Sequence, residues 1–237
     1  MKTFGLDGNV AVHVLYSFAG VATTVAVENR GGYLLLDCGD GALRDLLEAR
    51  LKPARLEGVA VSHGHFDHVG GLHTLFGFLR MVGREDALPV AYPAGCVEVE
   101  AFLDGFFGLY PDAPFAVERM PLGDGDEKKL DRWTVRAYAV KHRGSTAAGV
   151  GKPIPALGYR VGLGGVSVAF SGDTGPSENL RKLCEGADLA LVEATWGKRD
   201  LRLNPRIHLS RAEAEGYGRL AKRFGLIHGM HPSEGED

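Results

Sequence analysis

Six consecutive residues of this sequence hold four side chains that can bind metal ions. The segment reads His63-Gly64-His65-Phe66-Asp67-His68. Imidazole nitrogens and carboxylate oxygens suit zinc and related first-row divalent ions. Gly64 leaves the backbone free to wrap, so that the first two histidines can meet one ion while Asp67 and His68 turn toward a second. A surface loop that merely contains histidines is the alternative, and the density of ligands disfavours it.

Two further ligands are expected where later strands end. His142 follows a strand predicted at 133–141, and Asp173 follows a strand predicted at 166–171. The two oxygens of an aspartate in such a place can bridge two ions. A turn-forming aspartate before a helix would be the ordinary interpretation of Asp173 alone. Together with the histidine segment, however, these residues favour a centre with two metal ions.

The last ligand is expected from two histidines near the end of the sequence. They stand in the segment Leu226-Ile227-His228-Gly229-Met230-His231-Pro232. Side chains alternate between the faces of a strand, so the two histidines would face opposite ways unless Gly229 forms a bulge. We favour His231, because it stands at the expected strand end next to Pro232. His228 would then be a core residue or a residue behind the ligands.

The elements that must position these residues are strands interspersed with helices. Apolar runs between glycine-containing turns predict strands at 10–16, 23–28, 33–37, 58–62, 90–92, 133–141, 159–161, 166–171 and 189–193. Apolar residues at helical spacing predict helices at 43–51, 70–81, 98–107, 178–184 and 210–224. The histidine segment directly follows the strand at 58–62. No linker or repeat divides the chain, so residues 1–237 are expected to form a single α/β domain.

Composition excludes several classes of protein. A net charge of −3 gives no global basic field, so overall charge does not support a nucleic-acid substrate. The sequence has no leader-like start and no apolar stretch of about 18 residues, the length that spans a membrane, so we expect a cytoplasmic protein without membrane contact. Cys38, Cys96 and Cys184 lack metal-type spacing and are expected to be buried thiols. The oligomeric state stays open, and a homodimer is compatible with the sequence.

The order of motifs resembles the metallo-β-lactamase-fold hydrolases over nearly the whole chain. The resemblance rests on residues 35–41 (LLDCGDG), the histidine segment, His142, residues 171–174 (SGDT) and a C-terminal histidine. Residues 193–196 (EATW) and 208–210 (HLS), followed by a helix, are most similar to the phosphodiesterase branch that includes ribonuclease Z.

The resemblance implies a fold, a metal content and roles for three residues. The fold would be a four-layer αββα sandwich of two mixed sheets with outer helices. It would hold two divalent ions per chain, Zn²⁺ or alternatively Mn²⁺ or Fe²⁺, which share a water or hydroxide of lowered pKa. Asp67 would bind metal and orient or deprotonate the water, His208 would protonate the leaving oxygen, and Glu193 would orient His208. The ordinary alternatives are a strand-end carboxylate for Glu193 and a helix-start residue for His208.

The substrate implied is a small or cyclic phosphodiester. In ribonuclease Z the segment after the His142 position carries a long tRNA-gripping arm, whereas residues 144–157 here predict only a short loop with glycine and proline. Precursor tRNA is therefore not expected, although a ribonuclease Z-like endonuclease remains an alternative. A thioesterase, lactonase or β-lactamase could use the same metal site, and a metal-binding protein without hydrolytic activity is the alternative outside the enzymes.

Overall fold

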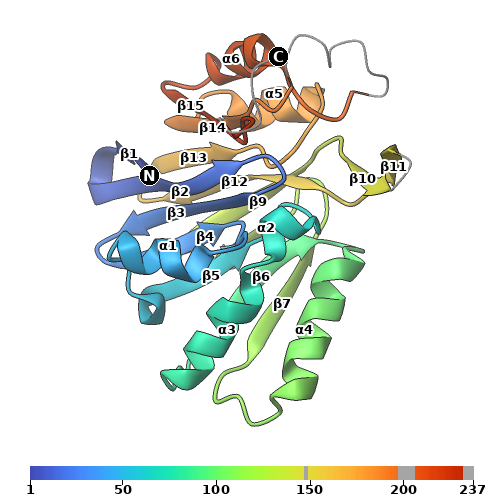
Figure 1. Cartoon of the computed structure of the whole chain (residues 1–237). Coiled ribbons are helices and arrows are strands. Elements are labelled where there is room, and N and C mark those ends of the chain that lie inside the picture. Colours follow the sequence, from blue (N-terminus) through green and yellow to red (C-terminus); the bar gives the residue numbers. More distant parts are fainter. Residues whose placement is uncertain (147–148, 197–205, 232–237) are drawn as a thin grey trace.

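Two mixed β-sheets pack face to face and carry helices on their outer surfaces (Figure 1). The structure is a computed structural model and describes residues 1–146, 149–196 and 206–231. Three clusters of buried side chains lie between its layers, one between the sheets and one beneath the helices on each side. This arrangement confirms the four-layer αββα sandwich expected from the sequence.

The first sheet follows the order of the sequence, from β1 to β7. Adjacent strands from β1 to β4 run antiparallel to each other, and adjacent strands from β4 to β7 run parallel. The strands are β1 (Lys2–Gly5), β2 (Val10–Phe18), β3 (Ala22–Asn29), β4 (Gly32–Leu36), β5 (Leu56–Ala60), β6 (Leu88–Pro93) and β7 (Val117–Leu122).

The second sheet has the order β15-β14-β13-β12-β9-β8. Its strands are β8 (Glu127–Leu130), β9 (Trp133–Ala139), β12 (Leu157–Leu163), β13 (Val166–Phe170), β14 (Leu189–Glu193) and β15 (Phe224–Ile227). β13, β14 and β15 run parallel to one another, and the remaining neighbours are antiparallel. The carboxyl ends of the three parallel strands therefore meet at one edge of this sheet.

The core between the sheets follows from the alternation of side chains along each strand. In β9, Trp133, Val135 and Ala137 are buried, whereas Arg136 between them is exposed. β4 is buried on both faces, with Leu34 and Leu36 in the core between the sheets and Tyr33 and Leu35 beneath the helices. A strand that is apolar on both faces is what a position inside a four-layer structure requires.

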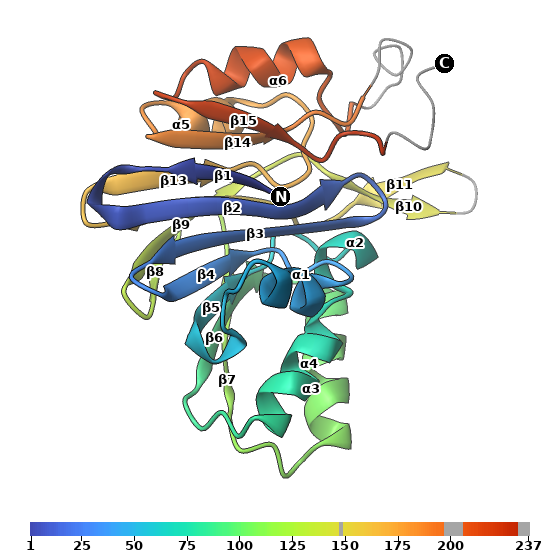
Figure 2. The ribbon, with the colours of Figure 1, turned by 60° about the vertical axis from the view of Figure 1, so that its left-hand side comes forward.

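Helices cover the outer face of each sheet (Figure 2). α1 (Ala42–Glu48), α3 (Leu72–Met81) and α4 (Val97–Leu109) pack on the first sheet, and α5 (Glu178–Cys184) and α6 (Arg211–Gly218) pack on the second. α3 buries Leu72, Leu75, Phe76 and Leu79, which share one face of a helix. The short helices are η1 (Asp7–Asn9), η2 (Pro53–Arg55) and α2 (Phe66–Val69).

Two expectations about the second half of the chain were wrong. β10 (Arg143–Thr146) and β11 (Gly149–Pro153) form an antiparallel pair that projects from the body of the molecule, where only a loop was expected (Figure 2). The helix expected at 210–224 ends at Gly218, and β15 begins at Phe224. A Cβ atom on Gly218 would lie 2.6 Å from the ring of Phe224, so the chain turns back on itself there.

The three cysteines are buried free thiols, as expected. No helix in the described part of the chain is long and apolar enough to cross a membrane.

Candidate metal centre and active site

The first sheet contributes the ligand-type residues from the end of β5. The chain leaves β5 at Ala60 and reaches His63 directly, and α2 then carries Asp67 and His68. The side chains of His63, Asp67 and His68 are buried, and that of His65 is half-buried. Gly64 meets a need for space rather than for backbone freedom, because a Cβ atom there would lie 2.8 Å from the Cβ atom of Glu98 on α4.

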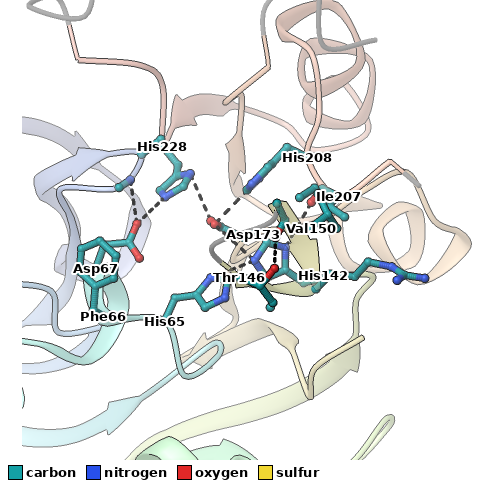
Figure 3. Close-up of a pocket in the computed structure, with 15 residues that line it drawn as sticks. His65, Phe66, Asp67, His142, Thr146, Val150, Asp173, Ile207, His208 and His228 are labelled. Atoms are coloured by element: carbon teal, nitrogen blue, oxygen red, sulfur yellow. Dashed lines mark hydrogen bonds and ion pairs between the residues drawn. The ribbon is translucent and has the colours of Figure 1, made fainter. Parts of the chain in front are cut away.

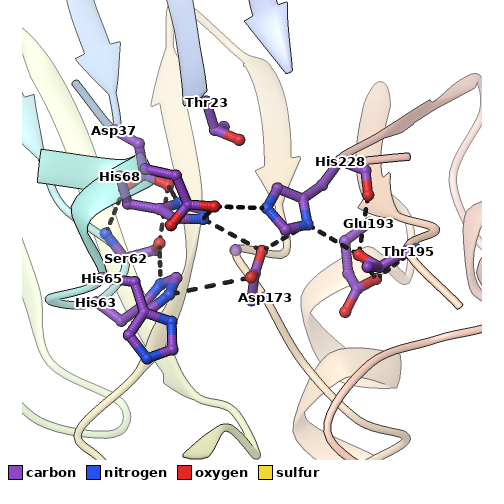
Figure 4. Close-up of polar contacts among 12 residues, drawn as sticks. Thr23, Asp37, Ser62, His63, His65, His68, Asp173, Glu193, Thr195 and His228 are labelled. Carbon is purple, nitrogen blue, oxygen red and sulfur yellow. Dashed lines mark hydrogen bonds and ion pairs between the residues drawn. The ribbon is translucent and has the colours of Figure 1, made fainter. Parts of the chain in front are cut away.

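The second sheet contributes Asp173 after β13 and His142 after β9, and both are buried. Asp173 lies at the centre of the cluster (Figure 4). Its Oδ1 is 3.5 Å from Nε2 of His68, and its Oδ2 is 4.0 Å from Nε2 of His63 and 3.9 Å from Nε2 of His142. The two carboxylate oxygens therefore face different histidines, which is the arrangement that a bridging ligand needs.

The ligand atoms form two groups on either side of Asp173. One group contains His63, His65 and His142, the other contains Asp67, His68 and His228, and within each group the atoms lie within 4.8 Å of one another. Asp173 itself forms a group with His63 and His68.

Unpartnered atoms test whether these residues fit metal ions. Nε2 of His63, His65 and His68 and Oδ1 of Asp173 are buried and have no hydrogen-bond partner among the described residues. Buried polar atoms in folded proteins are normally paired. Burial, reinforced by the neighbouring histidines, lowers the pKa of His63 well below its ordinary value, and burial lowers the pKa of His142 to about 4. Neutral imidazoles are the form that binds metal, so His63 and His142 fit divalent metal ions. Burial would also lower the pKa of His68, but Asp173 and Asp37 outweigh it and raise the pKa, and a cation at Nε2 of His68 would take the place of that proton.

The structure places His228, and not His231, in this cluster. Nε2 of His228 lies 3.3 Å from Oδ2 of Asp67, and its Nδ1 lies 3.3 Å from Oδ1 of Asp173. The ring of His231 instead packs edge-on against Phe18, with 4.9 Å between the ring centroids. The preference for His231 is therefore corrected.

His231 was preferred because the last strand was expected to end there, but the strand ends earlier and His228 is the residue that follows it. β15 ends at Ile227, and His228 has a positive φ of 53°, so it no longer follows the geometry of the strand. Its backbone N–H donates to Oγ of Ser17 at 2.9 Å, and its Nδ1 lies 2.8 Å from the hydroxyl oxygen of Thr195. These contacts hold the ring toward the centre.

Two polar residues that were not expected to act at the site orient its histidines. Oδ2 of Asp37 lies 2.6 Å from Nδ1 of His68, and Oγ of Ser62 lies 3.0 Å from Nδ1 of His63 (Figure 4). Ser62 also donates its N–H and its hydroxyl to Asp37, at 2.6 and 2.8 Å. An imidazole held through Nδ1 presents Nε2 to a metal ion. Asp37 lies in the 35–41 motif, which was the available signal, whereas Ser62 had none.

Glu193 and His208 form a hydrogen-bonded pair beside the cluster. Glu193 ends β14 and is fully buried, and its Oε1 lies 2.9 Å from Nδ1 of His208. The carboxylate also accepts bonds from the N–H groups of Thr174 and Thr195 and from the Thr195 hydroxyl, at 3.0, 3.0 and 2.9 Å. Burial alone would lower the pKa of His208, but the hydrogen bond and charge of Glu193 and the charge of Asp173 outweigh it, and the pKa is raised.

A cavity of about 330 Å³ opens over the cluster (Figure 3). His65, Asp67, His142, Asp173, His208 and His228 line its floor, and Thr146 and Val150 of the β10–β11 hairpin line one side. The side chain of Phe66 also lines the cavity, and this residue is 68% exposed. A small molecule can therefore reach the ligand atoms and His208 together.

A histidine and aspartate centre of this composition, set between two sheets, defines a metal-dependent hydrolase of the metallo-β-lactamase fold. The chain belongs to the β-lactamase superfamily, since the Beta-lactamase superfamily domain matches residues 33–227. Both the fold and the superfamily expected from the sequence motifs are confirmed.

Individual relatives carry a more specific name. Ribonuclease Z of Bradyrhizobium sp. (strain ORS 278) is 29% identical over 231 residues, covering 79% of this chain and 76% of that protein. Ribonuclease Z of Bacillus subtilis (strain 168) is 29% identical over 227 residues, covering 76% of this chain and 72% of that protein.

Solved structures agree on the fold. The short form of human tRNase Z superposes with a TM-score of 0.76 at 22% identity, covering 94% of this chain and 93% of that one. The metallo-β-lactamase fold protein YhfI from Bacillus subtilis superposes with a TM-score of 0.74 at 20% identity, covering 93% and 86%.

Proposed function

We propose that this hydrolase is a phosphodiesterase that uses two divalent metal ions, with zinc as the first candidate, to cleave a small or cyclic phosphodiester. The observation that carries the proposal is the His208–Glu193 pair, at 2.9 Å, beside the cluster of metal-ligand residues. Expulsion of an alkoxide from phosphorus needs a proton donor, and a histidine held by a buried carboxylate is suited to that role. The relatives named ribonuclease Z, which cleave phosphodiesters by name, add support.

The proposed metal ligands are divided between the two ions. His63, His65 and His142 would hold one ion, Asp67, His68 and His228 the other, and Asp173 would contact both. When bound, two such ions would polarise a phosphoryl oxygen and lower the pKa of a water toward neutrality.

Asp67 is placed to act on the attacking water. It lines the floor of the cavity, and its Oδ2 accepts a hydrogen bond of 2.9 Å from the N–H of Gly20. That bond and the nearby ring of His228 fix the carboxylate in one orientation. Asp67 can therefore orient the water and accept its proton.

His208 is placed to serve the leaving group. Its Nδ1 is occupied by Glu193, so Nε2 is the nitrogen through which the ring can donate a proton to the leaving oxygen. Burial lowers the pKa of His208, but the hydrogen bond and the charge of Glu193 outweigh it and raise the pKa above its ordinary value, which favours the imidazolium that can donate a proton. Glu193 thus acts as a positioning residue for His208.

Hydrolysis of bis(p-nitrophenyl) phosphate by metal-analysed protein tests the proposal. Turnover should be lost in Asp67→Ala. It should persist in the control variant His73→Ala, which changes an exposed residue of α3. The same preparation should be offered a glutathione thioester, a lactone and a β-lactam. Metal-loaded protein that cleaves one of these and leaves phosphodiesters intact would refute the phosphodiesterase and favour a hydrolase of carbon centres.

An RNA endonuclease is the second candidate, because the two relatives described above are named ribonuclease Z. The net charge of −3 and the short β10–β11 hairpin favour the smaller substrate. Incubation with a precursor tRNA and with 2′,3′-cyclic AMP separates the two candidates. Cleavage of the precursor tRNA but not of the cyclic nucleotide would show that the substrate is a polynucleotide and not a small phosphodiester.

A further inference from the structure

A second cavity, of about 300 Å³, adjoins the one over the metal-ligand cluster. We call it the basic cavity. It is lined by Val140, Lys141, His142, Arg143, Pro153, Ile154, Arg206 and Ile207. His142, Arg143 and Ile207 line both cavities, so a ligand of modest size can occupy both at once.

The lining of the basic cavity is strongly positive. It contains Lys141, Arg143 and Arg206 and no carboxylate, in a chain whose net charge is −3. Within the described ranges, neither Lys141 nor Arg143 forms an ion pair, and the hydrogen bond of the Arg143 guanidinium goes to the carbonyl oxygen of Gly151 at 3.0 Å. The charges of Lys141 and Arg143 are thus not offset by ion pairs within the described ranges, and such cations favour an anionic ligand.

Two short segments place these cations beside the centre. In Lys141-His142-Arg143 the middle residue belongs to the metal-ligand cluster, and its two neighbours line the basic cavity. In Arg206-Ile207-His208, Arg206 lines the basic cavity and His208 lines the cavity over the metal-ligand cluster. The same chain segments therefore fix the position of the basic cavity relative to the reacting groups.

Arg206 is held in place before any ligand arrives. It forms an ion pair with Glu213, whose carboxylate also receives the N–H and hydroxyl of Ser210, and its guanidinium lies 5.5 Å from the ring centroid of Trp196. The carboxylate of Glu213 offsets part of the positive charge of Arg206. Nε of Arg206 is buried without a hydrogen-bond partner in the described part of the chain. Arg206 therefore lines the basic cavity with a guanidinium of fixed position, and not all of its N–H donors are used within the described part of the chain.

We propose that the basic cavity binds a second anionic group, a phosphate monoester, of the same substrate whose phosphodiester is cleaved at the metal centre. The inference rests on the proposed function and narrows it to phosphodiesters that carry an additional phosphate. The cations would recognise the phosphate, while Pro153, Ile154 and Ile207 would contact the group that joins it to the diester.

A pair of matched substrates tests the basic cavity. Thymidine 5′-(p-nitrophenyl phosphate) is compared with the same compound carrying a 3′-phosphate, using metal-loaded enzyme and the release of p-nitrophenolate. Wild type should prefer the phosphorylated compound by about tenfold or more in kcat/KM, the effect of one or two charge-assisted contacts. Lys141→Met should reduce this ratio severalfold, and Lys141→Arg should largely restore it.

The control is Lys128→Met, since Lys128 is an exposed lysine of β8 that lines neither cavity. It should keep the wild-type ratio. If both substrates are cleaved equally well, the basic cavity has no such role and the phosphodiesterase stands. If neither is cleaved, calorimetric titration decides. Thymidine 3′,5′-bisphosphate should bind more tightly than thymidine 5′-monophosphate in wild type but not in Lys141→Met, and equal affinities in wild type would overturn the inference.

Discussion

Oδ2 of Asp37 lies 2.6 Å from Nδ1 of His68, and neither side chain has appreciable contact with solvent. Asp37 follows β4 with a left-handed φ of 58°, a conformation that costs a non-glycine residue free energy. It also receives the N–H and the hydroxyl of Ser62. One carboxylate therefore fixes both a histidine of the centre and the start of the histidine segment.

Asp37→Asn should weaken metal binding while leaving the fold intact. The amide has the same shape but loses the charge that orients His68, and loss of such outer partners typically lowers metal affinity by about 10- to 100-fold. Titration against a competing chelator measures the change. Asp40→Asn, at an exposed position of the same segment, is the control. Equal affinities for the two variants would show that Asp37 does not support the centre.

His228→Ala should reduce the bound metal from about two ions per chain toward one. His228 contacts Asp67 and Asp173 in the buried cluster, so its removal takes one ligand atom from the second group. His231→Ala is the matched variant and should keep the wild-type metal content, since its ring packs against Phe18. Inductively coupled plasma mass spectrometry of the purified variants measures the stoichiometry. The reverse pattern would return the ligand role to His231.

His208→Ala should affect substrates according to their leaving groups. An alkoxide needs a proton as it departs, and general acid catalysis contributes about 10²- to 10⁴-fold to such steps. The turnover of 2′,3′-cyclic AMP should therefore fall by such a factor. Turnover of bis(p-nitrophenyl) phosphate, whose phenolate leaves without a proton, should fall much less. An equal loss on both substrates would contradict the acid role and point to a structural role for His208.

Glu213→Ala should destabilise the fold by about 1 kcal/mol at neutral pH, because it removes half of a capping box. Burial raises the pKa of Glu213, but Ser210 and Arg206 outweigh it, so the pKa lies below its ordinary value. The stabilisation is therefore present above the unfolded-state pKa and is lost as the pH falls through the folded-state pKa.

Thermal melts of metal-free wild type and Glu213→Ala, at neutral and at acidic pH, measure this difference. The gap in Tm should narrow on acidification. Glu48→Gln, at an exposed position of α1, is the control and should show little gap at either pH. A gap that stays constant would mean that the charge of Glu213 does not contribute.

The parts of the site that could be predicted are those that depend on short stretches of sequence. The segment from His63 to His68 follows an apolar strand and carries its ligand-type side chains within six residues, so its position at a strand end was evident. Asp173 and Glu193 likewise end apolar strands. Such local patterns also predicted most strands, whereas the four layers were implied by the resemblance of the motifs to a known family.

The parts that could not be predicted depend on local backbone exceptions and on distant neighbours. His231 was preferred because the last strand was expected to end beside Pro232, but β15 ends at Ile227, and His228, with a positive φ, is the residue that turns toward the cluster. The role of Asp37 arises only when β4 and β5 pair and bring it to Ser62. The β10–β11 hairpin has no regular apolar alternation, since its residues are largely exposed, so composition alone suggested a loop.

The residues of the proposed metal centre come from both sheets, and this has a consequence for the order in which the molecule assembles. His63 and His68 come from the first sheet, while Asp173 and His228 come from the second, and the last of these follows the final strand of the described chain. Contacts between residues so far apart in sequence form slowly, because the entropy of closing the long loop between them opposes them. A nascent chain can therefore offer no complete centre until β15 has docked, so full loading with metal would mark a chain that has finished folding.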